Sequence, residues 1–176
     1  MGRDLSLKPP ATLIGLGNLL LRDEGAGVQA VRVLQDRYEV PPDLEVVDGG
    51  TAGLDLLPFI EGRERVLFVD AVNFGEGSGF IGELNNEEIP AFFAVKSSLH
   101  HLGLADVLAA AQLLGTLPRE VCLIGIQPHT LEPGLELSAE LQARLEYLLR
   151  KIIAKLGGWG ISLHRKVQGS KFKVQS

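Results

Sequence analysis

Apolar and polar positions along this chain follow two different patterns, one typical of buried strands and one typical of helices. Short apolar runs that end in polar or glycine-rich turns occur at 12–15, 44–48 and 66–70, and each is typical of a buried strand. Between these runs, apolar residues recur at helical spacing over 28–34 and, less regularly, over 54–60. Strands that alternate with helices predict parallel pairing through right-handed crossovers.

The pattern changes after residue 70. A glycine-rich loop leads directly into an apolar segment at 79–84, and the missing helix predicts an antiparallel strand. Helical spacing then returns over 104–114, and 121–126 is another buried strand. The last helix has Ser138 as its predicted N-cap, followed by leucines and an isoleucine on one face.

These elements predict an α/β fold with three layers. We expect a mostly parallel, five-stranded twisted sheet with one antiparallel strand and helices on both faces. A single α/β domain is predicted over 1–156, followed by a flexible basic C-terminal tail over 157–176. In such sheets ligands bind at the carboxyl ends of the strands, where the strand order reverses.

Composition and charge narrow the class of function. The chain has 176 residues, 45% of them hydrophobic, and a net charge of -5, which argues against nucleic acid as a partner. No run approaches the roughly 18 apolar residues of a membrane helix, and no signal-peptide core is present, so the cytoplasm is expected. The single cysteine, Cys122, lies in an apolar strand and is expected to be a core residue.

Side chains able to bind a metal gather at the predicted strand ends. Glu24 follows the turn after the first strand, Asp48 and Asp70 each end an apolar strand, and His100 and His101 precede a helix. Carboxylates and imidazole converging from separate strand ends are typical of a divalent metal site.

Each of these side chains also has a structural alternative. An aspartate at a strand end often ties a turn or caps the next helix, an alternative that applies to Asp48 more than to Asp70. Glu24 has the alternative of a solvated loop charge, and His100 that of a histidine satisfied at a helix entrance.

The Gly15-Leu16-Gly17 turn does not predict a nucleotide cofactor. A dinucleotide fingerprint would place a third glycine at position 20, where Leu20 stands. Glu24 and its neighbour Asp23 would also repel a pyrophosphate at the start of the helix.

The same turn with Asn18 is similar to the opening of bacterial peptidyl-tRNA hydrolases. The following residues, 19–24, do not continue as in that family, and the acidic charge disfavours tRNA.

From Leu13 to about Leu149 the sequence resembles the maturation endopeptidases of nickel-iron hydrogenases. Five separated motifs in the family's order carry the resemblance: Gly15-Leu16-Gly17-Asn18-x-Leu20-x-x-Asp23-Glu24-Gly25-x-Gly27, Asp48-Gly49-Gly50-Thr51-x-Gly53-x-x-Leu56-Leu57, Val69-Asp70-Ala71, Ser98-x-His100-x-x-Gly103-Leu104, and Ile124-Gly125-Ile126-Gln127-Pro128.

The resemblance implies a hydrolase that removes a short C-terminal extension from a hydrogenase large-subunit precursor. It implies that nickel is the recognition element and that the substrate supplies it, with no organic cofactor. Carried over by position, Glu24, Asp70 and His100 contact the metal, and Glu24, Asp70 and Asp48 form the catalytic set. His101 stands where the family often has glutamine, so it remains an alternative ligand.

Two other classes of function stay open from the sequence. One is a non-catalytic, nickel-checking maturation chaperone that binds the precursor and releases it uncut. The other is a peptidyl-tRNA-hydrolase-like or other metal-dependent hydrolase. The chain shows no Ser-His-Asp arrangement and no His-Glu-x-x-His helix, so a metal or a carboxylate is the expected source of an activated nucleophile.

Overall fold

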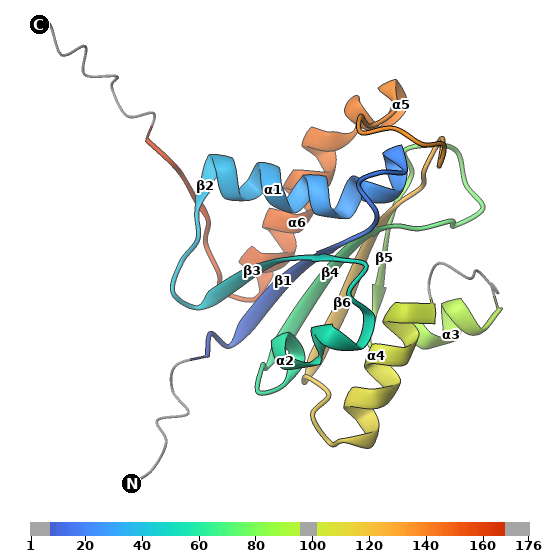
Figure 1. Cartoon of the computed structure of the whole chain (residues 1–176). Coiled ribbons are helices and arrows are strands. Elements are labelled where there is room, and N and C mark those ends of the chain that lie inside the picture. The colour runs from blue at the N-terminus through green and yellow to red at the C-terminus, as the bar shows by residue number, and fades with distance from the viewer. Residues whose placement is uncertain (1–7, 96–101, 168–176) are drawn as a thin grey trace, which may run out of the picture.

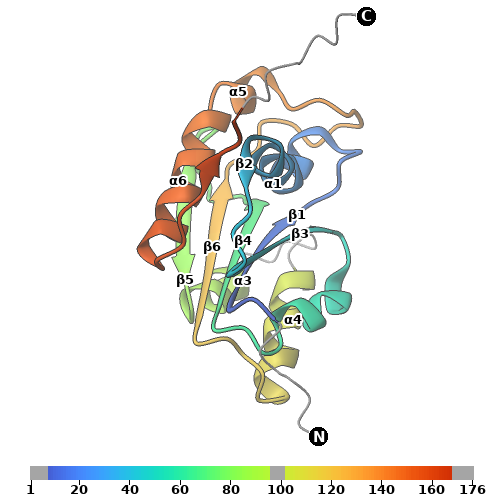
Figure 2. The same ribbon diagram turned by 90° about the vertical axis from the view of Figure 1, so that its left-hand side faces the viewer.

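The computed structural model describes residues 8–95 and 102–167, which form a central sheet with helices packed on both sides (Figure 1). The helices α1 and α6 cover one face, and α2, α3 and α4 cover the other (Figure 2). The three-layer α/β fold predicted from the hydrophobic pattern is therefore confirmed.

The strands and helices have the following bounds. The strands are β1 (Ala11–Leu16), β2 (Tyr38–Glu39), β3 (Leu44–Gly50), β4 (Arg65–Ala71), β5 (Ile81–Asn85), β6 (Glu120–Ile126) and β7 (His164–Arg165). The α-helices are α1 (Ala26–Arg37), α2 (Leu57–Ile60), α3 (Glu88–Val95), α4 (Leu102–Leu113), α5 (Ala139–Gln142) and α6 (Leu145–Gly158). The 3-10 helices η2 (Arg22–Gly25) and η3 (Gly53–Leu56) precede α1 and α2.

The main sheet has five strands in the order β3-β1-β4-β6-β5. All pairs are parallel except β5 with β6, which is antiparallel as predicted. The chain moves from β1 outward to β3 and then returns to β4 on the other side of β1. The strand order therefore reverses between β1 and β4, and a ligand site is expected at their carboxyl ends.

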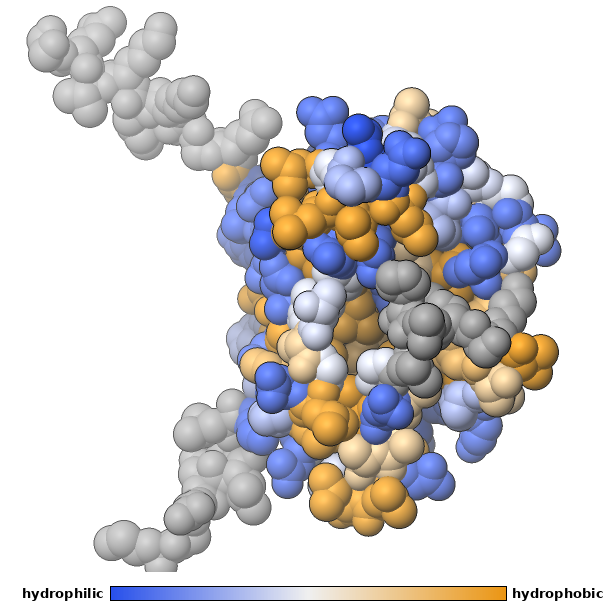
Figure 3. All heavy atoms as spheres, turned by 45° about the vertical axis from the view of Figure 1, so that its right-hand side comes forward, coloured by the Kyte–Doolittle hydropathy of each residue, from blue (hydrophilic) through white to orange (hydrophobic). Residues whose placement is uncertain are grey.

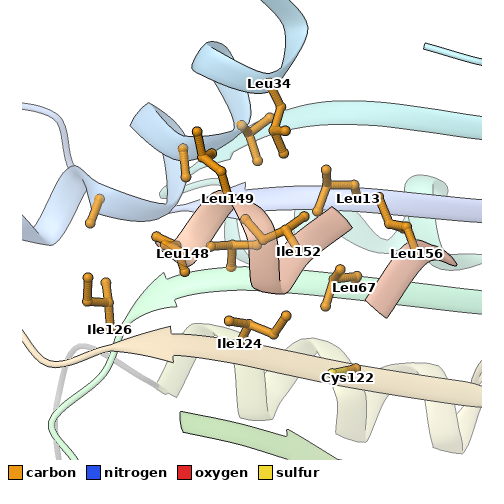
Figure 4. Packing of buried hydrophobic residues seen from close by; sticks show 14 of the residues in the cluster. Leu13, Leu34, Leu67, Cys122, Ile124, Ile126, Leu148, Leu149, Ile152 and Leu156 are labelled. Atoms are coloured by element: carbon orange, nitrogen blue, oxygen red, sulfur yellow. The ribbon is translucent and has the colours of Figure 1, made fainter. Parts of the chain in front are cut away.

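Each face of the sheet is sealed by its own hydrophobic core. On one face, Leu148 and Ile152 of α6 pack on Leu67 and Ile124 of the strands (Figure 4). Cys122 lies in the same core, so the prediction of a core cysteine is confirmed, and burial raises the pKa of its thiol to about 12.

The C-terminal segment differs from the expected flexible tail over 157–176. The proposed boundary falls inside α6, and the chain beyond it returns to the domain. Ile161 is buried, and β7 pairs with β2 in a small second sheet. Burial of this isoleucine, the β-ladder and a hydrogen bond from Lys166 N to Arg37 O hold the segment through Lys166, while 168–176 lie outside the described residues.

Two helices also differ in detail from the sequence pattern. Ser138 caps a helix as predicted, its hydroxyl accepting a hydrogen bond from Leu141 N, but a break at 143–144 divides this helix into α5 and α6. The short helix α3 was not predicted.

No helix within the described parts of the chain has the length and apolar character needed to cross a membrane.

Candidate active site

Asp70 stands at the carboxyl end of β4, where strand alternation decides the face that it occupies. Val66 and Phe68 lie in the core with α2, α3 and α4, whereas Leu67 and Val69 lie in the core with α1 and α6. Because successive side chains point to opposite faces, Asp70 shares its face with Val66 and Phe68. It is only 8% exposed.

Glu24 reaches the same edge because the chain folds back tightly after β1. Gly17 has φ +128°, and a Cβ at this position would lie 1.8 Å from the carbonyl oxygen of Glu24. Only glycine fits such an approach. The turn continues through η2, where the backbone N–H of Glu24 donates to Leu21 O at 3.1 Å.

A cavity of about 360 Å³ brings the two carboxylates together at the edge where the strand order reverses. Its walls come from the ends of β1 and β4, the segment after β3, the start of α4 and the loop after β6. The lining residues are Leu16, Gly17, Glu24, Gly50, Thr51, Gly53, Leu56, Asp70, Ala71, Asn73, Gly103, Leu104, Pro128 and Leu131. A cavity of this size has room for a few residues of a polypeptide.

The two carboxyl groups are electrostatically coupled. Burial raises the pKa of Asp70 to about 8, the backbone N–H of Ala71 opposes this rise, and the negative charge of Glu24 adds to it. A cation bound near both groups would favour their ionised forms. The donor chemistry of this cavity therefore suits a divalent metal.

Asp23 has a structural role that differs from that of its neighbour. It is fully buried, and its Oδ2 accepts hydrogen bonds from His129 N at 2.9 Å, Thr130 N at 3.0 Å and Ser138 Oγ at 2.7 Å. Its Oδ1 accepts from Ser138 N at 2.7 Å. Burial alone would raise the pKa of Asp23, but these hydrogen bonds outweigh it and hold the pKa below the usual value. Asp23 thus fixes the loop that forms one cavity wall.

Asp48 was predicted from the resemblance to belong to the catalytic set, but the structure does not bring it to the cavity. It shares a sheet face with Leu44 and Val46, whose side chains lie in the α1 and α6 core. Its Oδ2 accepts a hydrogen bond from Arg32 Nη2 of α1 at 2.8 Å. The alternation that turns Asp70 toward α4 turns Asp48 toward α1.

The predicted metal contact of His100, with His101 as its alternative, lies outside the described residues. The cavity takes in Gly103 and Leu104, which belong to the same sequence motif as His100. Within 8–95 and 102–167, no group of three or more His, Cys, Asp or Glu side chains could hold a metal ion.

A part-buried amide network beside the cavity was missed by the sequence reasoning. Gln127 Nε2 donates to Asn73 Oδ1 at 3.2 Å, and the backbone N–H of Phe74 donates to Gln127 Oε1 at 2.7 Å. This network shapes the loop after β4 and holds Asn73 on the cavity wall. The available signal was Gln127 itself, a polar residue directly after a buried strand.

A serine, a histidine and an acid also come together, though the sequence predicted no such arrangement. His129 Nδ1 lies 3.1 Å from Ser78 Oγ, and His129 Nε2 lies 3.5 Å from Glu140 Oε1. The His129 and Glu140 side chains are 48% and 44% exposed, and none of the three residues lines the cavity. The acid is beyond normal hydrogen-bonding distance, so the arrangement lacks the contacts of a catalytic triad.

Comparison with known proteins gives one consistent result. Residues 28–155 match the model of a family described as hydrogenase maturation protease. The hydrogenase 2 maturation protease of Escherichia coli strain K12 is 40% identical over 150 residues, which cover 85% of this chain and 92% of that protein.

Solved structures agree with this match. The hydrogenase maturating endopeptidase HybD from E. coli has a TM-score of 0.84 and 38% identity, covering 89% of this chain and 97% of its own. The [NiFe] hydrogenase maturation protease HybD from Thermococcus kodakarensis has a TM-score of 0.66 and 29% identity, covering 83% of this chain and 97% of its own.

Proposed function

The chain belongs to the hydrogenase maturation protease family and is an endopeptidase. We propose that it removes the C-terminal extension of a hydrogenase large-subunit precursor. We further propose that nickel already inserted in the precursor is the element it recognises. The nickel is then part of the substrate, and the protease needs no resident organic cofactor.

The observation that carries the nickel proposal is the pair of acidic side chains on one cavity. Glu24 lies in η2, after β1, and Asp70 lies at the end of β4. Burial raises the pKa of Asp70, and the negative charge of Glu24 raises it further. This repulsion is relieved when a cation binds between them. His100, the third predicted contact, would add an imidazole, a ligand that suits nickel.

Recognition through the bound metal accounts for selectivity. A nickel-loaded precursor would be anchored by these side chains, placing its scissile bond over the cavity. A precursor without nickel would lose the anchoring contacts and would present the bond poorly. Premature cleavage would thus be slow without any separate checking step.

Hydrolysis then requires only water and a proton acceptor. Water adds to the carbonyl carbon of the scissile peptide bond, and a carboxylate in the cavity accepts the proton that the water releases. The tetrahedral intermediate breaks its C–N bond, and the departing nitrogen takes up a proton. The products are a new carboxyl terminus on the large subunit and the free C-terminal peptide.

Mass spectrometry of a cognate large-subunit precursor tests both parts of the proposal. We expect loss of a short C-terminal peptide from nickel-loaded precursor and no loss from nickel-free precursor. Equal cleavage of both forms would refute nickel recognition, whereas binding without cleavage would refute hydrolysis and favour the chaperone alternative.

A variant pair locates the reaction in the cavity. Asp70→Asn keeps the size of the side chain but removes a carboxylate from the cavity, and we expect it to abolish processing while the fold remains intact. Asp48→Asn makes the same chemical change outside the cavity, so it is the matched control. Normal processing by Asp70→Asn would refute the assignment of this cavity.

A further inference from the structure

Three large apolar side chains are exposed beside the cavity, and we call them the apolar rim. They are Leu20, Leu131 and Leu135, which are 64%, 43% and 69% exposed. Leu131 also lines the cavity, so the rim is continuous with it. In Figure 3 hydrophobic residues gather on the upper part of the molecule, at the end where Figure 1 places α5 and the segment leading to it.

The backbone that carries the rim is firmly held. Gly134 N donates to Leu20 O at 2.9 Å, and Arg22 N donates to Gly134 O at 3.0 Å, so the two rim segments are joined directly. The four hydrogen bonds to buried Asp23 secure both ends of the segment 129–138. The leucines are therefore presented in a fixed arrangement rather than on a loose loop.

Exposed apolar side chains on a fixed backbone are suited to binding. Clustered apolar exposure on a protein surface marks interaction sites, and a preformed backbone lowers the entropy cost of binding. An endopeptidase must bind its polypeptide substrate at the catalytic cavity. Because Leu131 belongs to both the rim and the cavity, a precursor segment that leaves the cavity on this side passes over these leucines.

A second exposed apolar patch lacks this connection. Leu113, Leu114 and Leu117 lie at and beyond the C-terminal end of α4 and are 90%, 66% and 44% exposed. None of them lines the active-site cavity. Apolar exposure alone therefore does not distinguish the two patches, but continuity with the cavity does.

We propose that the apolar rim binds an apolar stretch of the precursor that directly adjoins the scissile bond. This inference rests on the proposed function, because it assigns a subsite to the same cleavage reaction. It divides recognition into two parts. The carboxylates of the cavity contact the metal-bearing part of the precursor, and the rim contacts apolar side chains beside the bond to be cut.

Steady-state cleavage of nickel-loaded precursor by rim variants tests this division. Leu20→Gln, Leu131→Gln and Leu135→Gln retain side-chain length but remove apolar surface, and as exposed substitutions they leave folding largely unchanged. We expect KM to rise about threefold to tenfold for each variant and about 100-fold for the triple variant. The fall in kcat is expected to stay below about threefold, since the reacting groups are untouched.

The double variant Leu113→Gln/Leu114→Gln is the matched control, with an expected KM within about twofold of the unaltered protein. A triple rim variant with unchanged KM would overturn the inference, as would an equal rise in KM for the control. Calorimetric titration with nickel-loaded precursor measures Kd without requiring cleavage. Failure of the unaltered protein to cleave refutes the proposed function, whereas an unchanged Kd in the triple rim variant refutes the rim.

Discussion

Removing the charge of Asp70 should make the protein more stable at neutral pH, even though it removes a predicted functional group. Burial raises the pKa of this carboxyl from 3.8 to about 8. A raised acid pKa means that the native state binds a proton that the unfolded chain releases. Stability contributed by this proton is fully present below about pH 3.8 and is lost progressively as the pH rises toward 8.

The size of the effect follows from the two pKa values. Each pH unit between them changes the free energy of unfolding by about 1.4 kcal/mol, so the loss at pH 7 approaches about 4 kcal/mol. Water entering the cavity reduces this figure, and the new amide has its own desolvation cost. We therefore expect Asp70→Asn to gain about 2–3 kcal/mol at pH 7, which raises Tm by about 5–10 °C.

Urea unfolding of both proteins between pH 4 and 8, with a chelator present, measures this difference. The advantage of Asp70→Asn should be near zero at pH 4 and should grow steadily to pH 8. Asp48→Asn is the exposed control, with an expected change within about 0.5 kcal/mol at every pH. A stability difference that does not vary with pH, or a less stable Asp70→Asn at pH 7, would show that burial does not perturb Asp70.

Three further predictions concern residues outside the Glu24 and Asp70 pair. Asp23→Ala leaves four donors without their acceptor, two of them buried on Ser138, and we expect urea titration to show a loss of about 3–5 kcal/mol at pH 7. Because the pKa of Asp23 is lowered in the native state, the stability that this carboxylate contributes is present above about pH 3.8 and disappears as the pH falls through the folded pKa. If Asp23→Ala lost as much stability at pH 3 as at pH 7, this reasoning would be wrong. Asp48→Asn should retain most cleavage activity, since its partner Arg32 lies on α1 away from the cavity; near-total loss in a precursor cleavage assay would restore the catalytic role expected from the sequence. Ser78→Ala should cleave at an unchanged rate, and a hundredfold fall in kcat would mean that its contact with His129 is catalytic after all.

The sheet was predictable from the sequence because each of its strands has a local sequence signal. A strand buried on both faces is a continuous apolar run, and the turn after it is polar or glycine-rich. The absence of a helix before β5 was enough to predict its antiparallel direction. The two-residue strands β2 and β7 were not predictable, since so short a ladder leaves no periodic signal.

The candidate site was only partly predictable, for a geometric reason. Asp48 and Asp70 both end apolar strands, and the sequence distinguishes them only by the residues that follow, which favour a structural role for Asp48 more than for Asp70. Their faces depend on which helices cover each side of the sheet, and that is decided by the crossovers rather than by the strands themselves. Only with the layers in place does alternation assign Asp70 to the cavity and Asp48 to α1.

The neighbours Asp23 and Glu24 show how a single turn serves both architecture and chemistry. Gly17 lets the chain fold back so closely that no other residue fits, and η2 then places two adjacent acids in different surroundings. Asp23 accepts four hydrogen bonds and fixes the segment that carries Leu131. Glu24 lines the same cavity as Leu131. One turn therefore gives two consecutive acids different surroundings: Asp23 holds the backbone of one cavity wall, and Glu24 is the candidate functional carboxylate.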